Sequence, residues 1–581
     1  MGYAFYGCHT PGSAVIFTYM YLRESRQKLA NGTLTHLQLV ESVWNPTKRR
    51  SEIRILFNCG RAGDPLVTER LRRLAHSILR RCSPEEIIAT DSTWQLINAW
   101  PYGDAYVLQT LWEQLGIDQI IKEQVAKRHF GFDMERALFA MVANRALAPS
   151  SKLYCYEQWL QEDVRVVGCD SLKLQHLYRA MDFLEAHKDA IEQAIFFRVS
   201  DLLNLDVDVI FYDTTSLHFE IDEADHGVGE GDEVRGSRAA GARRYPALRK
   251  RGHPKNGRSD VPQIVVGLAV TREGFPVRHW VFPGNTVDVT TVQRVKEELR
   301  GWQLSRCLFV GDAGMVSAPN LKILARGGGK YLLCMPMRRG DEITNEVMAY
   351  RGRYKLVADN LQVKEVIVGE GERRRRYVLC HNPQEAERQR AHRAEVVEAL
   401  TAELASLRET ADGEHSKREC ALRSSARYGR YLKLSAEGHL VLDAKKIKDA
   451  ERFDGKFVVH GNDDSLSAAD MALGYKQLQR VEEAWRTLKS GLRLRPVFHW
   501  APHRIHAHVA LTVLSLLLER TAEHACGDTW RNLRDDLKGI KLAQLLSPHG
   551  TVWQVTDPTP AAAKRLKLLG MKHPPPLLQV A

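Results

Sequence analysis

The sequence contains neither a long apolar run nor a closely spaced pair of cysteines. Its ten cysteines are scattered over 581 residues and never form CxxC, which argues against a zinc site or a disulfide framework and favours a reducing compartment. The apolar run at residues 13–22 has no basic leader and is too short to span a bilayer. We therefore expect a cytoplasmic protein without a membrane partner.

Internal repeats and a phosphate-binding loop are also absent. The glycine-rich stretch "ARGGGKY" at residues 325–331 lacks the spacing of a P-loop, so we expect no nucleotide cofactor.

The charge balance points to a polyanionic partner. The chain has 83 Lys and Arg against 71 Asp and Glu, a formal net charge of +12. A positive field attracts nucleic acid, although a basic protein without such a partner is the alternative. The length predicts two to four domains.

Hydrophobic patterning predicts several kinds of region. "THLQLVESVW" and "SEIRILFNC" flank a turn and predict a β-hairpin. "MERALFAMVANRAL" and "KLYCYEQWL" predict two helices around a short turn, as in a helix-turn-helix or in ordinary bundle packing. From residue 207 strands and helices interleave, which is typical of an α/β fold.

Two aspartates follow apolar, strand-like runs. Asp213 follows "VDVIFY", which predicts that it closes a short strand, and Asp312 follows "CLFVG". Each is also explained by a cap or a turn. Carboxylates at the ends of adjacent strands share a hard cation such as Mg²⁺ well, because Mg²⁺ prefers oxygen ligands.

A third carboxylate lies on the predicted helix "YKQLQRVEEAWRTLKSGLRLRP". Val481, Trp485 and Leu488 form an apolar stripe. The neighbouring stripe contains Glu482, and its other members are Tyr475, Leu478, Arg486 and Lys489. This arrangement suits a metal ligand beside phosphate-binding cations, and a surface ion pair between Glu482 and Arg486 is the alternative.

Residues 220–258 have no hydrophobic periodicity, and their second half is basic. We expect this half, and in particular Arg249, Lys250 and Arg251, to contact DNA phosphates. The acidic first half is expected to be a solvated loop.

Together these stretches resemble bacterial insertion-sequence transposases of the Asp-Asp-Glu type, in the subgroup with a β-rich insertion before the catalytic Glu. The stretches that carry the resemblance span roughly residues 207–520 and are "FYDTTSLHFE", "GRSDVPQIVVGLAVTREGFPVRHWVFPGNTVDVTT", "LFVGDAGM", "FDGKFVVHGND" and "YKQLQRVEEAWRTLKSGLRLRPVFHWAPHRIHAHVALTVLSLLL".

The resemblance implies an α/β fold with an RNase H-like mixed-sheet catalytic core. The implied segments are a β-hairpin region (1–90), a helical region that is a candidate DNA-binding domain (91–205), the first part of the core (206–339), a β-rich insertion with a long helix (340–465), the helical end of the core (466–530) and a tail (531–581).

It also implies that Asp213, Asp312 and Glu482 are the catalytic and metal-binding triad for two Mg²⁺ or Mn²⁺ ions. The family signature on the last helix is Tyr-x2-Arg-x3-Glu-x6-Lys. Tyr475, Glu482 and Lys489 match it, whereas Leu478 replaces the Arg and removes one expected phosphate contact. Tyr475, Arg486 and Lys489 would contact DNA.

The implied reaction is cleavage at the ends of an insertion sequence, followed by attack of the freed 3′-OH on target DNA. The implied partners are double-stranded DNA, as terminal repeats and as target, and a second copy of the chain in a synaptic homodimer within the bacterial nucleoid. The alternatives are a nuclease of the same fold without strand transfer and an inactive basic DNA-binding protein derived from a transposase.

Overall fold

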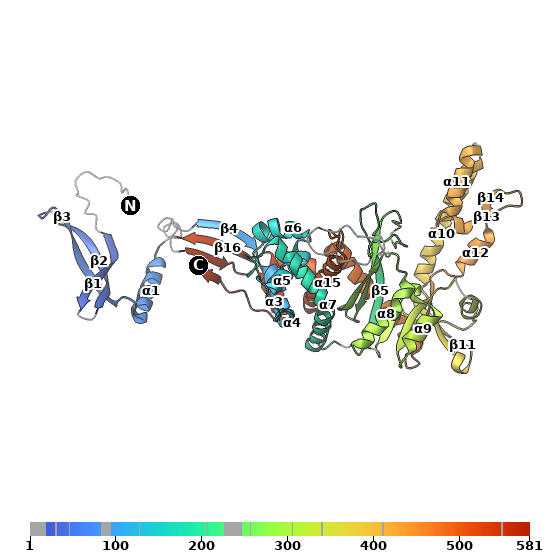
Figure 1. Ribbon diagram of the computed structural model, residues 1–581, viewed down its shortest axis with the longest axis horizontal. Helices are drawn as coiled ribbons and strands as arrows, with labels where there is room; N and C mark the ends of the chain where they lie inside the picture. The colour runs from blue at the N-terminus through green and yellow to red at the C-terminus, as the bar shows by residue number, and fades with distance from the viewer. Residues whose placement is uncertain are drawn as a thin grey trace. The chain divides into compact units, whose positions relative to one another are not determined.

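The chain forms two compact units, and each is described by itself (Figure 1). The smaller contains Met1–Ile97, Gln544–Val552 and Val580–Ala581, and the larger contains Asn98–Ala543 and Trp553–Gln579. The structure, a computed structural model, describes residues 19–29, 32–45, 47–82, 95–126, 128–205, 207–225, 247–255, 257–304, 306–338, 341–408, 412–547 and 550–580.

The smaller unit contains an antiparallel three-stranded sheet of β1 (Tyr19–Leu29), β2 (Gly32–Asn45) and β3 (Arg50–Arg61). The expected hairpin is confirmed as β2 and β3, and the side chain of Asn45 accepts backbone N–H donors in the turn between them. Helix α1 (Pro65–Leu79) follows, and Asp64 caps its first turn.

The larger unit begins with a helical region, as expected. Its helices are α3 (Gly103–Gln114), α4 (Ile117–Val125), α5 (Met134–Leu147), α6 (Lys152–Tyr154), the π-helix η1 (Cys155–Asp163) and α7 (Leu174–Leu202). Residues 134–146 of α5 are all buried, and α5 packs against α3, α7 and α15 (Pro502–Cys526). A helix surrounded by protein on every side cannot enter a DNA groove, so α5 itself is a bundle helix. The second helix of a helix-turn-helix is the one that reads DNA, and here Leu153 and Tyr154 of that segment are exposed. The helix-turn-helix alternative therefore stays a prediction.

A mixed nine-stranded sheet forms the centre of the larger unit. Its order is β10-β11-β12-β15-β9-β8-β5-β6-β7. The strands are β5 (Val209–His218), β6 (Gln263–Val270), β7 (Pro276–Pro283), β8 (Leu308–Gly311), β9 (Lys330–Met335), β10 (Lys355–Ala358), β11 (Leu361–Val368), β12 (Arg375–His381) and β15 (Lys456–Gly461). β5, β8 and β9 run parallel to one another, and the other pairings are antiparallel.

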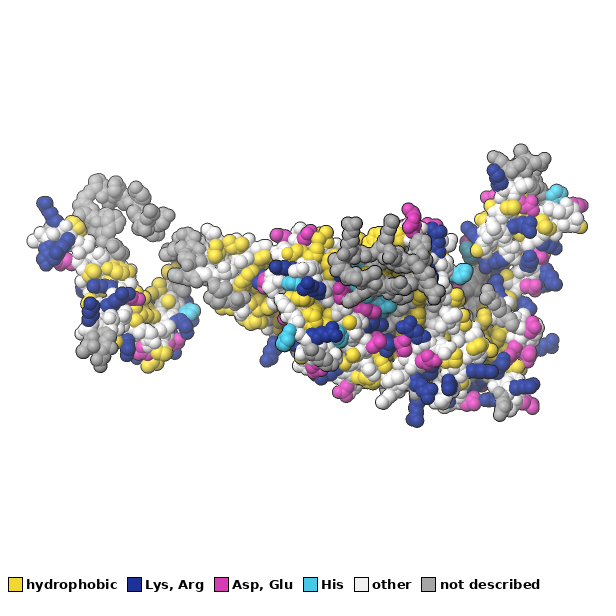
Figure 2. All heavy atoms as spheres, in the orientation of Figure 1, with side chains coloured by type: hydrophobic (Ala, Val, Ile, Leu, Met, Phe, Trp, Pro, Cys, Tyr) yellow, Lys and Arg dark blue, Asp and Glu magenta, His cyan; other side chains and the backbone are white. Residues whose placement is uncertain are grey.

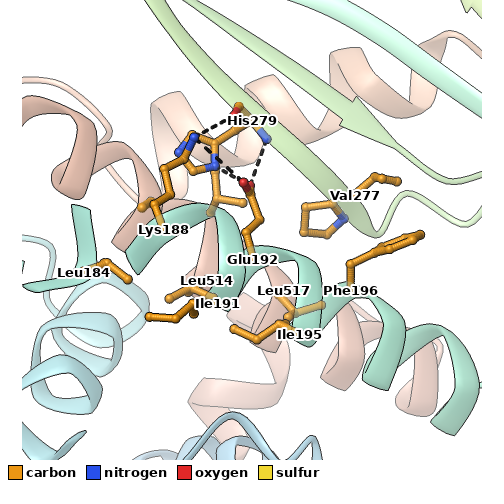
Figure 3. Close-up of a pocket in the computed structure, with 13 residues that line it drawn as sticks. Leu184, Lys188, Ile191, Glu192, Ile195, Phe196, Val277, His279, Leu514 and Leu517 are labelled. Atoms are coloured by element: carbon orange, nitrogen blue, oxygen red, sulfur yellow. Dashed lines mark hydrogen bonds and ion pairs between the residues drawn. The ribbon is translucent and has the colours of Figure 1, made fainter. Parts of the chain in front are cut away.

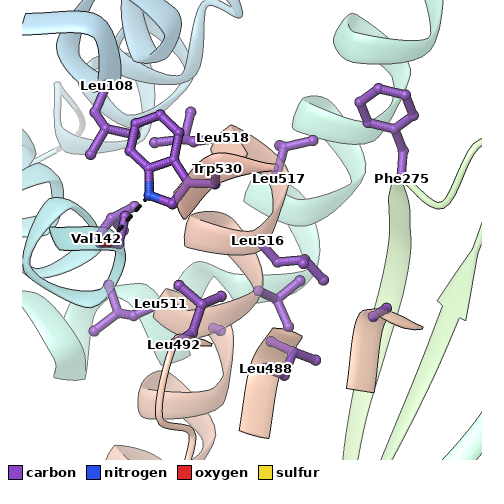
Figure 4. Packing of buried hydrophobic residues seen from close by; sticks show 14 of the residues in the cluster. Leu108, Val142, Phe275, Leu488, Leu492, Leu511, Leu516, Leu517, Leu518 and Trp530 are labelled. Atoms are coloured by element: carbon purple, nitrogen blue, oxygen red, sulfur yellow. Dashed lines mark hydrogen bonds between the residues drawn. The ribbon is translucent and has the colours of Figure 1, made fainter. Parts of the chain in front are cut away.

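Apolar side chains cover both faces of this sheet, as expected for strands that are buried throughout. Ile210 and Tyr212 of β5 pack with α8 (Asp288–Gly301) and α9 (Ala318–Ala325) in one cluster. Phe211 faces the opposite side and belongs to the largest cluster, which also includes the buried leucines of α15 (Figure 4). The alternation of side chains along a strand therefore assigns the apolar residues of β5 to two different cores.

Four strands of the expected insertion join the central sheet, and only the short β13 (Leu432–Leu434) and β14 (Leu440–Leu442) among its described strands pair with each other in a sheet of their own. β10, β11, β12 and β15 extend the central sheet beyond β9. The long charged helix is confirmed as α10 (Pro383–Arg408). It packs with its neighbours in a small separate core, and these are α11 (Asp412–Ser424), the β13–β14 pair and α12 (Ala444–Glu451) (Figure 1).

Residues 531–581 differ from the expected tail. They contain most of α16 (Trp530–Leu537), then β16 (Lys541–Ser547), β17 (Gly550–Val555), α17 (Pro560–Leu568) and β18 (Leu577–Val580). Leu533, Ala562 and Leu566 are buried in the largest core, and the three strands form a sheet with β4 (Gln95–Pro101). The proline-rich stretches "DPTP" and "HPPP", which are typical of a tail, lie at the start of α17 and in the connection from α17 to β18.

None of the helices in the described ranges has the length and apolar character needed to cross a membrane. On the face of the larger unit drawn in Figure 2, basic and acidic side chains are interspersed. The positive net charge is therefore not gathered into one patch on that face.

The central core should respond strongly to truncation at Leu516. This side chain is fully buried in the largest cluster (Figure 4), so Leu516→Ala should lower the free energy of unfolding by about 2–5 kcal/mol. Leu568 is 45% exposed, and Leu568→Ala should cost less than about 1 kcal/mol. Denaturant unfolding of both variants measures the difference, and equal losses would contradict the assignment of the core.

Candidate active site

The parallel pairing of β5 with β8 brings two aspartates together. Phe211 lies opposite Val310 in this pairing, and the same register, continued by two residues, aligns Asp213 with Asp312. Phe211 and Val310 both belong to the largest core, so the alternation of side chains directs both aspartates to that side of the sheet. The two strands that precede these aspartates are therefore neighbours in one sheet.

Asp213 does not close its strand, and this expectation was wrong. β5 continues to His218 because its other edge pairs with β6, where Leu268 lies opposite Asp213. Thr214 is buried within the strand rather than in a loop. Asp213 instead lies level with the end of the shorter partner strand β8.

Glu482 lies on α14 (Gln479–Arg486), which packs on β5 and β6. The expected apolar stripe is confirmed, since Val481 and Trp485 are buried in the cluster that contains Phe211. Glu482 itself is exposed beside this stripe. An ion pair on this helix joins Glu483 to Arg480 at 3.3 Å.

Both aspartates influence Glu482 electrostatically. Burial raises the pKa of Glu482, and the negative charges of Asp213 and Asp312 raise it further. Burial also raises the pKa of Asp213, although the Lys255 ammonium opposes this shift. The third element therefore lies within electrostatic range of both aspartates.

Tyr475 contacts the site through a carboxylate. It lies on α13 (Ala468–Lys476), a separate helix from α14, and its hydroxyl donates a hydrogen bond to Asp312 Oδ1 at 3.3 Å. The expected single continuous helix is therefore divided, with Leu478 at the start of α14. Leu478 is buried in the core, so an apolar contact replaces the arginine of the signature at this position.

Arg486 and Lys489 lie beyond Glu482, as the sequence predicted. Arg486 is exposed at the end of α14, and Lys489 is half-buried in the π-helical turn η6 (Thr487–Gly491). Burial lowers the pKa of Lys489, and the nearby Arg495 lowers it further. The charge of Asp213 acts in the opposite direction, which places Lys489 close to the acidic site.

The basic segment is engaged in contacts within the protein. Arg249 is buried, and its guanidinium donates two hydrogen bonds to Asp225 Oδ1, at 2.6 and 2.9 Å. The backbone of Lys250 pairs with Gln263, and Arg251 donates to the Asp222 carbonyl at 2.9 Å. A phosphate contact by Arg249 would require its ion pair to break. The basic residues between 226 and 246 lie outside the described residues.

Two residues of the site were not singled out from the sequence. Lys255 was counted with the basic segment, yet its ammonium lies 3.3 Å from Asp213 Oδ1 and 3.2 Å from Asp288 Oδ2. Asp288 was quoted only within the stretch "PGNTVDVTT". The sequence signal that could have indicated Asp288 is its position at the start of a predicted helix, α8, shortly after the strand β7.

The carboxylates of the site are the kind of ligand that a hard divalent cation prefers. Asp213, Asp312 and Glu482 offer only oxygen ligands, and a cation between them would relieve the repulsion that raises the pKa of Glu482. As they stand, no three Asp, Glu, His or Cys side chains in the described part of the chain are placed to hold a metal ion. The Lys255 ammonium supplies the positive charge beside Asp213 instead.

A separate small cavity lies between α7, α15 and β7 (Figure 3). Its lining is mostly apolar, and the polar side chains of Lys188, Glu192 and His279 lie together on one part of it. The His279 ring lies 2.7 Å from Glu192. Burial alone would raise the pKa of Glu192, but His279 and Lys188 lower it to about 2. None of the three triad residues lines this cavity.

Comparison with known proteins identifies the family to which this acidic site belongs. Residues 230–518, about half of the chain, match the family described as "Transposase DDE domain". The chain is a DDE-type transposase. The match includes Asp312 and Glu482 and begins after Asp213, so the role of Asp213 rests on the strand register.

The similarity of this transposase to curated proteins and to solved structures is low. No curated protein matches it significantly. The solved structure of a piggyBac transposase synaptic complex with hairpin DNA is similar over 75% of this chain and 80% of that one, with 11% identity and a TM-score of 0.32. A likeness of this size carries no argument about the site.

Proposed function

We propose that this transposase cuts DNA at the ends of an insertion sequence and joins the freed 3′ ends to target DNA. Asp213, Asp312 and Glu482 would form its metal-dependent active site. The observation that carries the proposal is the register of β5 and β8, which aligns the two aspartates beneath the helix that bears Glu482.

We also propose that the core is RNase H-like. Support comes from five strands in chain order: β5 is central, β6 and β7 follow antiparallel on one side, and β8 and β9 follow parallel on the other. The acidic residues would then lie on two strands and one helix, as the family resemblance implies. Helix α8 crosses from β7 to β8 and covers the opposite face.

Two Mg²⁺ or Mn²⁺ ions, when bound, would supply activation of the attacking oxygen and stabilisation of the leaving 3′ oxygen. Asp213, Asp312 and Glu482 would hold them. Tyr475 fixes the Asp312 carboxylate through its hydroxyl, which limits the orientations of that ligand. Arg486 and Lys489 would hold a DNA phosphate beside the site, since both are cations that follow Glu482 within the next two turns of the chain.

The same chemistry defines the proposed partners. The substrate would be double-stranded DNA, first the terminal repeats and then the target. Two element ends need two active sites, so we propose a homodimer on DNA. A bacterial, nucleoid-associated location is part of the same proposal.

Replacement of Glu482 by Gln tests the triad. The amide keeps the shape of the side chain but carries no negative charge, so attraction for a hard dication falls. Cleavage of element-end DNA in Mg²⁺ should fall by about two or more orders of magnitude, while DNA binding persists. Gel-based cleavage and binding assays on the same preparation measure the two effects.

Glu483→Gln is the matched control for this variant. Glu483 is adjacent in sequence but forms its ion pair with Arg480, and its replacement should leave cleavage largely intact. Normal cleavage by Glu482→Gln, or equal losses in both variants, would remove Glu482 from the triad. Hydrolysis without joined products in a strand-transfer assay would instead indicate a nuclease.

The basic segment should separate into structural and DNA-contacting residues. Arg249→Ala removes the buried partner of Asp225 and should lower the melting temperature. Lys250→Ala with Arg251→Ala should instead weaken binding to all DNA sequences and flatten the salt dependence by about one unit per lost contact. Fluorescence titrations at several salt concentrations measure the slope. An unchanged slope would show that Lys250 and Arg251 do not touch DNA.

A further inference from the structure

The Lys255 ammonium occupies a position between two carboxylates of the site. It lies 3.3 Å from Asp213 Oδ1 and 3.2 Å from Asp288 Oδ2, and it donates a hydrogen bond to the Thr214 carbonyl at 2.6 Å. These three oxygens match the three N–H donors of an ammonium. An all-oxygen environment of this kind is also what Mg²⁺ and Mn²⁺ prefer.

Asp288 is held in place independently of Lys255. The Thr214 hydroxyl donates a hydrogen bond to Asp288 Oδ1 at 2.5 Å. On the other side, a Cβ atom on Gly314 would come within 3.2 Å of Asp288 Oδ2, so only a glycine leaves this close approach unobstructed. Asp288 thus lies against both β5, next to Asp213, and the turn that follows Asp312.

Lys255 is able to leave this position. Its side chain is 43% exposed, and a lysine has a long flexible stem with a compact charge. An ammonium and a divalent cation cannot occupy the same set of oxygens, so binding of one excludes the other.

We propose that Asp288 is a fourth carboxylate of the metal site and that the Lys255 ammonium takes the place of a divalent cation in the metal-free protein. This inference rests on the proposed function, since it assumes that Asp213 binds metal. It predicts a site in which the Lys255 ammonium offsets part of the carboxylate charge before metal arrives, and that releases Lys255 when metal binds.

Mn²⁺ binding to the full-length protein without DNA tests both parts, with free Mn²⁺ followed by electron paramagnetic resonance. Lys255→Met removes the competing ammonium and should tighten Mn²⁺ binding by about tenfold or more. Adding Asp288→Asn to Lys255→Met isolates the carboxylate, because Lys255 is then absent from both proteins. The double variant should bind Mn²⁺ about 10–100-fold more weakly than Lys255→Met.

Asp260→Asn in the same Lys255→Met background is the matched control. Asp260 is an exposed carboxylate, 62% accessible and paired with Arg258, and its replacement should leave Mn²⁺ affinity unchanged. Thr214→Val, which removes the hydroxyl donor but keeps the carboxylate, separates metal ligation from the positioning of Asp288. It should cost less affinity than Asp288→Asn, and melting temperatures show whether each variant is folded.

Two results would overturn the inference. If Lys255→Met binds Mn²⁺ no more tightly than the wild type does, the Lys255 ammonium does not take the place of the cation. A double variant that binds as tightly as Lys255→Met would remove Asp288 from the site. Asp213→Asn distinguishes failure of this inference from failure of the proposed function. If Asp213→Asn also binds Mn²⁺ as tightly as the wild type does, the proposed metal site itself is wrong. If Asp213→Asn loses Mn²⁺ binding, the proposed metal site is retained.

Discussion

The parallel pairing of β5 with β8 is the constraint on which the acidic site depends. It fixes the register in which Asp213 and Asp312 are aligned, and the two-residue alternation of strands then decides the face on which both emerge. A shift of one residue in either strand would move one aspartate to the α8 side of the sheet. The cores on the two faces oppose such a shift, because it would also bring Phe211 or Val310 into the wrong cluster.

The helix with Glu482 depends on the same sheet. Val481 and Trp485 bury one side of α14 against the strands, which leaves Glu482 at the edge of the buried stripe rather than within it. Carboxylates brought together in this way repel one another, and nearby cations offset part of this repulsion. Lys255 lies directly between Asp213 and Asp288, and Lys489 lies on the turn beyond α14.

Local pattern predicted much of this arrangement. The apolar runs before Asp213 and Asp312 predicted their strands, and the stripe through Val481 predicted the helix and its buried face. Pattern alone could not predict that Asp213 lies in mid-strand, because the length of β5 is set by its pairing with β6, a segment fifty residues away along the chain. The ion pair of Arg249 with Asp225 and the position of Lys255 also depend on tertiary contacts between segments. For the same reason, the strands expected as a separate insertion could not be assigned to the central sheet from sequence.

The proposed function requires that Asp213, Asp312 and Glu482 together bind the divalent cations of a DNA-cutting site. Anomalous X-ray diffraction from crystals of the protein grown with element-end DNA and Mn²⁺ locates these ions. We expect Mn²⁺ peaks bounded by the carboxylates of all three residues. Mn²⁺ bound elsewhere, or bound without contact to Asp213 and Asp312, would contradict the proposed function.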